Sequence, residues 1–306
     1  MNKVTVSKLH TLTGHKDSIY TLTGIDGKHF LSGSGDGMAV IWDLETPGTG
    51  HLLAKVPASI YALKYHPYRK QVLLGQNFEG IHYIDIASKK EIKTLKLNNS
   101  AIFDLQYFGN TIIAATGSGI VFLIDWESNT IVHKINMSDK SARTIAINYH
   151  KEEFAVGYSD HSIRIFNWNN YQLKKEIKSH KNSVFTLKYS PDEKFLLSAG
   201  RDAQVKIWDA EEAYQQVESI VAHMYAINDL HFSPNGKHFV TCSMDKSIKV
   251  WDAETFRLLK VIDKARHAGH GTSVNKVYWS AYGDQMVSCS DDRTISVWDI
   301  KFDEVI

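Results

Sequence analysis

Near-copies of one sequence segment recur along the whole chain, and their spacing limits the possible folds more than any other feature. Seven segments end in a similar short motif, which in four of them contains Trp-Asp. The residues at the shared end position are Trp42, Ile84, Ile124, Phe166, Trp208, Trp251 and Trp298. Successive end positions lie 42, 40, 42, 42, 43 and 47 residues apart, which is typical of a four-stranded unit with its turns. The sequence therefore predicts seven equivalent structural repeats.

Each repeat consists of short β-rich runs separated by turn residues. In the fifth repeat the runs cover residues 183–189, 195–198 and 205–208, and Pro191 and Gly200 lie in the turns between them. Short runs at regular intervals indicate antiparallel sheets, and no long stretch has the 3.6-residue period of an amphipathic helix. We expect an all-β protein.

Four repeats also share a His, a Ser or Thr, an Asp and the Trp at nearly constant spacing. The offsets are 18, 4 and 6 residues, with 17 in place of 18 in the first repeat. The four sets are His15, Ser32, Asp36, Trp42; His180, Ser198, Asp202, Trp208; His223, Thr241, Asp245, Trp251; and His270, Ser288, Asp292, Trp298. Repeats two, three and four lack the pattern. Their Trp positions hold Ile84, Ile124 and Phe166, and their Asp positions hold Phe78, Ser118 and Asp160.

On these motifs the chain resembles the WD-repeat (WD40) propeller family, from about Val4 to Ile300. The resemblance implies an all-β, seven-bladed β-propeller. It also implies that in each complete set the Asp orients the His, the His contacts the hydroxyl, and the hydroxyl reaches the Trp indole, as a buried structural network that rigidifies the blade. The family pattern further implies that the N-terminal strand pairs with the third strand of the last blade and closes the ring.

The repeat boundaries predict one domain, residues 1–306. Residues 4–12 are expected to form the outer strand of blade 7. The predicted blades 1 to 7 cover residues 15–56, 57–97, 98–136, 138–178, 180–221, 223–262 and 267–300.

Ser, His and Asp within one repeat also suggest a hydrolase triad. Four repeated copies, each with a Trp donor and none in a Gly-x-Ser-x-Gly turn, favour the structural role instead.

The sequence also offers little for a metal or nucleotide site. His267 and His270 could suggest a metal site, but His270 already belongs to the network set. The turn Ser290–Arg293 is typical of a strand connection rather than a calcium site. No nucleotide-binding loop and no Cys pair at zinc spacing occurs. We expect no enzyme activity, no cofactor and no metal.

Charge and cysteine usage narrow the class of partner and the compartment. The formal net charge is +1, which provides no basic field for nucleic acid, and the Lys clusters at 89–96 and 174–181 are expected on outer edge strands. The N-terminal segment lacks the apolar run of a secretory signal, and Gly and polar residues interrupt the uncharged stretch 105–124. Cys242 and Cys289 are expected to be buried free thiols. We expect a cytoplasmic protein without nucleic-acid or membrane partners.

The start of each innermost strand contributes one residue to a shared position, which in the family rims the narrower mouth of the central channel on the top face. The seven residues are Tyr20, Tyr61, Phe103, Arg143, Phe185, Asn228 and Asn275. Four are aromatic and one is Arg, the residue types that dominate protein-binding hot spots. Adjoining turn residues extend this surface: Asn77, Ser159, Arg201, Met244 and Asp291. The interpretation that the row merely plugs the channel stays open beside it.

These observations favour a non-catalytic scaffold or adaptor, a monomeric propeller within a complex, that binds a peptide or protein on the top face. One alternative is a structural subunit of a larger complex that is bound through the sides of the blades. An enzyme that uses the propeller as a frame is the less favoured alternative. Repeats two to four lack the network but supply Tyr61, Phe103 and Arg143, so this half of the chain is the first place to expect the partner.

Overall fold

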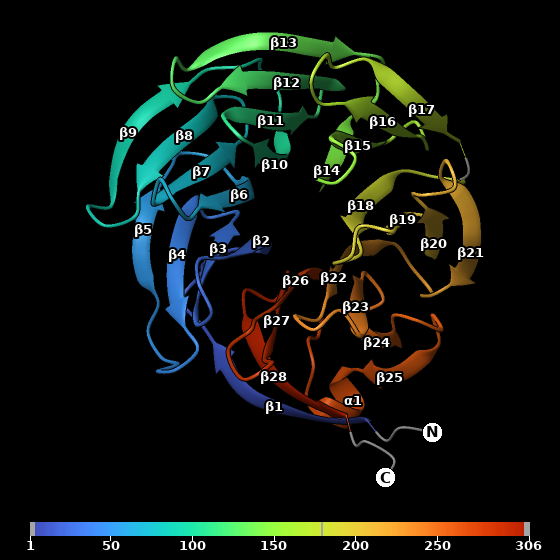
Figure 1. Cartoon of the computed structure of the whole chain (residues 1–306). Coiled ribbons are helices and arrows are strands. Elements are labelled where there is room, and N and C mark those ends of the chain that lie inside the picture. Colours follow the sequence, from blue (N-terminus) through green and yellow to red (C-terminus); the bar gives the residue numbers. More distant parts are fainter. Residues whose placement is uncertain (1–3, 179, 303–306) are drawn as a thin grey trace. The chain divides into compact units, whose positions relative to one another are not determined.

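The computed structural model describes residues 4–178 and 180–302, which form strands and one short helix. The strands make seven antiparallel sheets of four strands each (Figure 1). Six sheets consist of four strands that are consecutive in the chain, and the seventh combines the first strand with the last three. Each sheet corresponds to one predicted repeat, and we call the sheets blades 1 to 7 in chain order.

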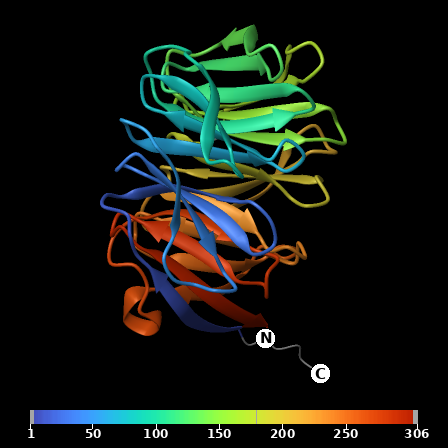
Figure 2. The same ribbon diagram turned by 90° about the vertical axis from the view of Figure 1, so that its left-hand side faces the viewer.

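The chain divides into two compact units. Unit 1 contains Met1–Ile60 and Asn228–Ile306, and unit 2 contains Tyr61–Ile227. Blades 1, 6 and 7 belong to unit 1, and blades 2 to 5 belong to unit 2. Within unit 2, the strands of each sheet run side by side in both views (Figure 2).

Unit 1 holds twelve strands and the helix among its described residues. Blade 1 consists of β2 (Ile19–Gly24), β3 (His29–Ser34), β4 (Met38–Asp43) and β5 (His51–Lys55). Blade 6 consists of β22 (Ile227–Phe232), β23 (His238–Ser243), β24 (Ile248–Asp252) and β25 (Leu258–Ile262). Blade 7 consists of β26 (Val274–Trp279), β27 (Met286–Ser290), β28 (Ile295–Phe302) and β1 (Val4–Leu12), and helix α1 (Lys264–His267) precedes it.

Unit 2 holds sixteen strands among its described residues. Blade 2 consists of β6 (Ile60–His66), β7 (Gln71–Gln76), β8 (Gly80–Asp85) and β9 (Lys90–Leu95), and blade 3 of β10 (Ile102–Phe108), β11 (Thr111–Thr116), β12 (Ile120–Asp125) and β13 (Thr130–Asn136). Blade 4 consists of β14 (Ala142–Asn148), β15 (Glu153–Tyr158), β16 (Ile163–Asn167) and β17 (Leu173–Ile177), and blade 5 of β18 (Val184–Tyr189), β19 (Phe195–Gly200), β20 (Gln204–Asp209) and β21 (Gln215–Val221).

Strand β1 completes blade 7, as the sequence predicts. It pairs antiparallel with β28, from Val4 opposite Phe302 to Leu12 opposite Ile295. The side chains of Val4 and Leu12 are buried at the two ends of this pairing. The two ends of the chain are thereby joined in one sheet, which satisfies the backbone groups of β28 that an unpaired edge would leave exposed.

Within each unit the core lies between neighbouring blades, and the inner and middle strands contribute buried apolar side chains to it. Between blades 2 and 3, Leu73 and Tyr83 pack in one cluster with Ile102, Ile112 and Trp126. The outer strands are different: β9, for example, is mostly exposed along its length. Burial of both sheet faces explains why the middle strands read as nearly continuous apolar runs.

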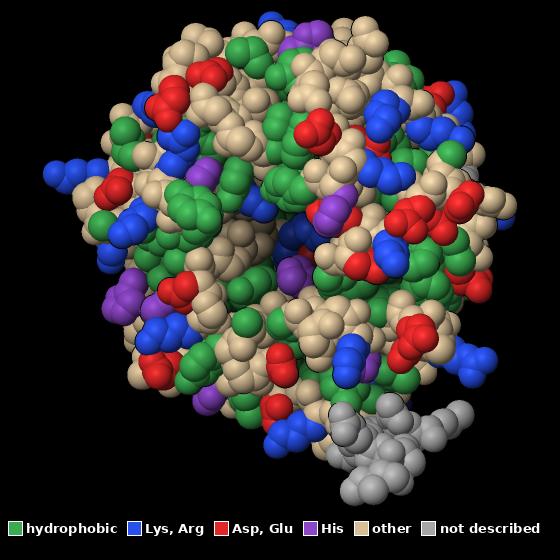
Figure 3. Space-filling view, viewed as in Figure 1, with side chains coloured by type: hydrophobic (Ala, Val, Ile, Leu, Met, Phe, Trp, Pro, Cys, Tyr) green, Lys and Arg blue, Asp and Glu red, His purple; other side chains and the backbone are tan. Residues whose placement is uncertain are grey.

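The described residues contain two buried cysteines and no membrane-spanning helix. Cys242 and Cys289 are both free thiols, and burial raises the pKa of each. In the part of the chain that the structure describes, no helix has the length and apolar character needed to cross a membrane. On the face shown in Figure 3, Lys and Arg side chains are interspersed with Asp and Glu, so this face presents no large area of one charge.

Candidate functional site

The predicted His, Ser, Asp and Trp of blade 5 come together between its strands. His180 Nδ1 lies 2.9 Å from an Asp202 carboxylate oxygen, and His180 Nε2 lies 2.6 Å from Ser198 Oγ. The indole Nε1 of Trp208 donates to the same Ser198 Oγ at 2.8 Å. Burial opposes ionisation of Asp202, but hydrogen bonds from His180 and from two backbone N–H groups hold its pKa below the usual range. The chain of contacts thus links the turn to the middle of the blade.

The same contacts occur in blades 1 and 7. In blade 1, His15 lies 3.1 Å from Asp36 and 2.7 Å from Ser32 Oγ, to which Trp42 donates at 2.8 Å. In blade 7 the corresponding distances are 2.9 Å from His270 to Asp292, 2.9 Å from His270 to Ser288 and 2.8 Å from Trp298 to Ser288. In blade 6, the indole of Trp251 donates to Thr241 Oγ1 at 2.9 Å, and His223 is also buried.

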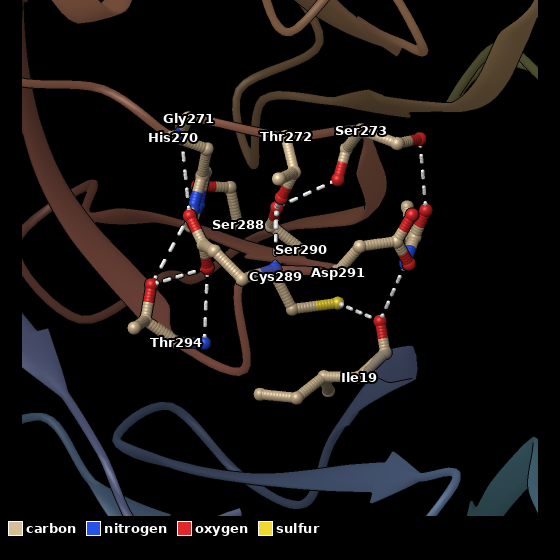
Figure 4. Close-up of polar contacts among 12 residues, drawn as sticks. Ile19, His270, Gly271, Thr272, Ser273, Ser288, Cys289, Ser290, Asp291 and Thr294 are labelled. Atoms are coloured by element: carbon tan, nitrogen blue, oxygen red, sulfur yellow. Dashed lines mark hydrogen bonds and ion pairs between the residues drawn. The ribbon is translucent and has the colours of Figure 1, made fainter. Parts of the chain in front are cut away.

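The close-up of blade 7 shows how its network continues into the neighbouring turn (Figure 4). Ser290 Oγ lies 2.9 Å from Thr272 Oγ1 and donates to the Ser273 carbonyl at 2.6 Å. The Cys289 thiol contacts the Ile19 carbonyl at 3.4 Å. The turn hydroxyls and the thiol are therefore engaged in contacts within unit 1.

The network hydroxyls are poorly placed to act as nucleophiles. Ser32, Ser198 and Ser288 have no exposed surface, and each Oγ already contacts a His nitrogen and accepts from a Trp indole. A serine nucleophile needs access to a substrate carbonyl in addition to its base. The arrangement supports stabilisation of the blades instead. Among the described residues, no group of three or more His, Cys, Asp or Glu side chains is placed to hold a metal ion.

Blades 2, 3 and 4 are held by other contacts. Ile84, Ile124 and Phe166, which replace the Trp, are all buried. In blades 2 and 3, His66 stacks on Tyr107 with ring centroids 4.3 Å apart, and Trp126 lies edge-on to His66 at 4.9 Å. Aromatic packing of this kind replaces the polar network with apolar contact.

Blade 4 contains a buried carboxylate, Glu153 at the start of β15, that sequence reasoning missed. Its two oxygens bind the Tyr214 hydroxyl and the Lys174 ammonium group. Tyr189 extends the chain, with its hydroxyl 2.6 Å from that of Tyr214. Burial raises the pKa of Tyr214, and Tyr189 and Glu153 raise it further, so Tyr214 stays protonated. The group joins blades 4 and 5, where the repeat pattern offers no such link.

The shared inner-strand position differs between the units, and in unit 2 it forms a continuous aromatic and cationic row. The rings of Tyr61 and Phe103 lie 5.7 Å apart. The guanidinium group of Arg143 lies 4.2 Å from the centroid of Phe103 and 5.6 Å from that of Phe185. All four side chains are partly exposed. We call these four residues the aromatic row.

In unit 1 the same strand position ties neighbouring strands together. Asn228 Nδ2 donates to Ser273 Oγ at 3.0 Å and to the Val274 carbonyl at 2.8 Å. Asn275 Nδ2 donates to the Ile19 carbonyl at 3.0 Å and to Asp291 at 2.7 Å. Tyr20, the third member, is partly exposed, and its ring lies close to Gly35. The two Asn side chains and Asp291 thus form hydrogen bonds inside unit 1.

The remaining turn residues of the predicted surface are spread over both units. Arg201 and Met244 are exposed, whereas Asn77 and Ser159 are partly buried. Ser159 Oγ accepts from Arg143 Nε at 2.9 Å, which joins this turn to the aromatic row. Asp291 is exposed apart from its contact with Asn275.

The turn of blade 2 presents Phe78, which the sequence suggested only as a departure from the repeat. Phe78 has a left-handed φ of 71° and its side chain is 54% exposed. In the described residues of the other six blades, the left-handed residue stands one position later in this turn, at Gly37, Gly119, His161, Ala203, Lys246 and Arg293. A bulky residue in this conformation is strained. An exposed aromatic side chain held in this way is a candidate contact residue.

Comparison with known proteins links this geometry to a family. The family model described as "WD domain, G-beta repeat" matches residues 6–43, 171–209, 214–252 and 263–299, which together make up half of the chain. A solved structure, the WD40 beta propeller domain of Doa1, superposes with a TM-score of 0.85 over 97% of both chains at 17% identity. This likeness identifies the fold as the predicted seven-bladed β-propeller.

Three proteins resemble the chain at low sequence identity over the aligned residues. The Periodic tryptophan protein 2 homolog of Mus musculus is 25% identical over 65% of this chain, and the Striatin homolog of Dictyostelium discoideum is 27% identical over 63%. Actin-interacting protein 1 of Drosophila melanogaster is 26% identical over 60%. The chain spans only 24%, 26% and 31% of the lengths of these three proteins.

Proposed function

Because the chain belongs to the WD40-repeat family and has its β-propeller fold, we propose that it is a non-catalytic interaction module of the cytoplasm that binds a peptide or protein segment. The binding surface is the predicted channel mouth, and its principal contacts come from Tyr61, Phe103, Arg143 and Phe185. Propellers support many unrelated functions, so the site and not the fold must carry this proposal.

The observation that carries the proposal is the aromatic row of unit 2. Three rings and a guanidinium group lie in contact and remain partly exposed, although aromatic rings that serve only as core are normally covered. Aromatic and Arg side chains dominate protein-binding hot spots because they bury a large area with little loss of conformational freedom. One similar protein, Actin-interacting protein 1, is named for binding another protein.

The proposal is tested by affinity capture from native cells, followed by mass spectrometry, with the double variant Tyr61→Ala/Phe103→Ala. We expect the double variant to lose the proteins that the unchanged chain captures and to keep its circular dichroism spectrum. Ile92→Ala is the matched control, because Ile92 is also apolar, 50% exposed and in unit 2, but lies on the outer strand β9. Loss of capture by Ile92→Ala alone would instead favour binding through the sides of the blades.

A further inference from the structure

The guanidinium group of Arg143 is held in place on one side and open on the other. Its central carbon lies over the rings of Phe103 and Phe185, 4.2 Å and 5.6 Å from their centroids, and Nε donates to Ser159 Oγ at 2.9 Å. The two Nη nitrogens make no hydrogen bond to any described residue and are not among the buried polar atoms. The side of the group that forms parallel, two-pronged hydrogen bonds therefore faces solvent in a fixed orientation.

No carboxylate of the described chain pairs with this group. The candidates in these turns of unit 2 have other partners: Asp160, in the same blade as Arg143, pairs with Arg164 at 2.9 Å, and Glu79, in the equivalent turn of blade 2, accepts from Gln76 at 2.6 Å. A second cation, Arg201, stands on the exposed turn of blade 5 and also has no ion pair among the described residues. Burial lowers the pKa of Arg143, and the charge of Arg201 lowers it further. Positive charge is thus gathered here without a compensating group.

Two further cationic side chains lie on the inner strands of unit 2. Lys64 on β6 and Lys188 on β18 occupy equivalent positions, three residues after Tyr61 and Phe185. Neither forms an ion pair among the described residues, and Lys64 lies 5.7 Å from the Tyr107 ring. Asp104, the nearest carboxylate to influence Lys64, already accepts from the backbone N–H groups of Leu105 and Ile145. Three cations, Arg143, Lys64 and Lys188, therefore lie on the inner strands of unit 2, and none of them has a carboxylate partner among the described residues.

We propose that the partner segment is acidic: an oxyanion of the peptide binds the open side of Arg143, and an adjacent apolar side chain packs against Phe103 and Tyr61. This inference rests on the proposed function and specifies the chemistry of its ligand. Arg binds carboxylate and phosphate groups through two parallel hydrogen bonds. These charge-assisted hydrogen bonds are stronger than hydrogen bonds between neutral groups. The oxyanion is either an Asp or Glu carboxylate or a phosphorylated side chain, which the experiment distinguishes.

The probes are four fluorescent pools of nine-residue peptides that differ only in the central residue, which is Glu, phosphoserine, Gln or Lys. Two flanking positions on each side are randomised among Leu, Ile, Val, Met and Phe, and the ends are Gly-Ser. Fluorescence anisotropy with the full chain measures binding of each pool. We expect the Glu or the phosphoserine pool to bind at least about tenfold more tightly than the Gln pool, with the larger preference identifying the oxyanion, and the Lys pool to bind most weakly.

Variants assign this preference to Arg143. Arg143→Gln should bind all four pools equally, and Arg143→Lys should lose most of the preference because it keeps the charge without the planar fork. Ser159→Ala, which removes only the orienting contact, should weaken the preference and keeps the test valid if an Arg143 variant fails to fold. Lys175→Gln is the control, because it removes a charge from the exposed outer strand β17 and should leave the preference unchanged.

Two results would overturn the inference, and they have different meanings. If all pools bind equally and Tyr61→Ala abolishes that binding, the acidic ligand is wrong while the proposed function stands. If no pool binds the chain at all, both the acidic ligand and a peptide site at the aromatic row are contradicted.

Discussion

At one strand position, the inner strands of the two units carry different chemistry. In unit 1, Asn228 and Asn275 use their amides to join neighbouring strands. In unit 2, Phe103 and Phe185 contact Arg143, whose Nη groups remain open to solvent. A position that the repeat fixes in space can thus serve stability in one part of the chain and be available for a ligand in another.

A second difference separates the blades by how they are stabilised. Blades 1, 5 and 7 each have a buried His, Ser, Asp and Trp chain of contacts, whereas blade 4 relies on Glu153, Tyr214 and Lys174. The first arrangement lies within one blade and is repeated. The second joins two blades and occurs at one place among the described residues. Loss of one partner should therefore have a larger effect in the second arrangement.

The largest effect is expected from Glu153→Ala. The change leaves the Tyr214 hydroxyl buried without its acceptor and Lys174 without its carboxylate, and it opens a cavity where Glu153 has no exposed surface. Because the Lys174 side chain is 42% exposed, the loss comes mainly from the unsatisfied Tyr214 hydroxyl and the cavity, and we expect about 2–5 kcal/mol. Urea unfolding measures the loss, and Glu153→Gln, which keeps an acceptor for Tyr214, should lose less. Equal losses for the two variants would contradict a role for the charge.

A smaller loss is expected from Ser198→Ala in blade 5. His180 Nε2 and Trp208 Nε1 both contact Ser198 Oγ, so the variant leaves two buried nitrogens without a partner. An unsatisfied buried group costs about 1–3 kcal/mol, and the blade keeps its packing and its Asp202 contact. Ser198→Thr is the control, because Thr241 fills this position in blade 6. A stability unchanged by Ser198→Ala would show that the network contributes nothing.

The smallest effect is a dependence of stability on pH that comes from His15 in the network of blade 1. Burial lowers the pKa of His15, and the hydrogen bond and charge of Asp36 oppose this shift without cancelling it. The unfolded chain then binds a proton near pH 6.5 that the folded chain resists, so stability falls as the pH drops below that value. We expect the melting temperature to fall between pH 7.5 and 5.5, and His15→Asn to reduce this fall. A steeper fall of the melting temperature in His15→Asn would contradict a lowered pKa of His15 in the folded chain.

The fold was predictable because its signals are local and repeated. The spacing of the Trp positions predicts seven sheets, and the missing outer strand of blade 7 predicts the pairing of β1 with β28. The Glu153 cluster was not predictable, because its residues come from separate segments of two blades and it occurs at one place among the described residues. The turn at Phe78 was missed for a related reason. A departure from the repeat shows that the turn changes, but not which residue takes the left-handed conformation.

The sequence only partly indicates which inner-strand side chains are available to bind a ligand. Asn275 and Arg143 occupy the same position and are both polar, and their residue types do not show which is engaged. The difference depends on neighbouring groups. Asp291 and the Ile19 carbonyl accept both amide hydrogens of Asn275, whereas among the residues that the structure describes only Ser159 accepts a hydrogen bond from Arg143. Such partners come from turns and adjacent blades and are set by packing.

The central claim, that the inner strands of unit 2 bind a ligand while those of unit 1 stabilise the fold, is tested most directly by measuring acidic-peptide affinity and unfolding free energy for Arg143→Gln and Asn275→Ala side by side. Arg143→Gln should lose the preference for the acidic pools and less than about 1 kcal/mol of stability. Asn275→Ala should keep the preference and lose about 1–2 kcal/mol. Equal loss of binding in both variants, or loss in Asn275→Ala alone, would contradict the account.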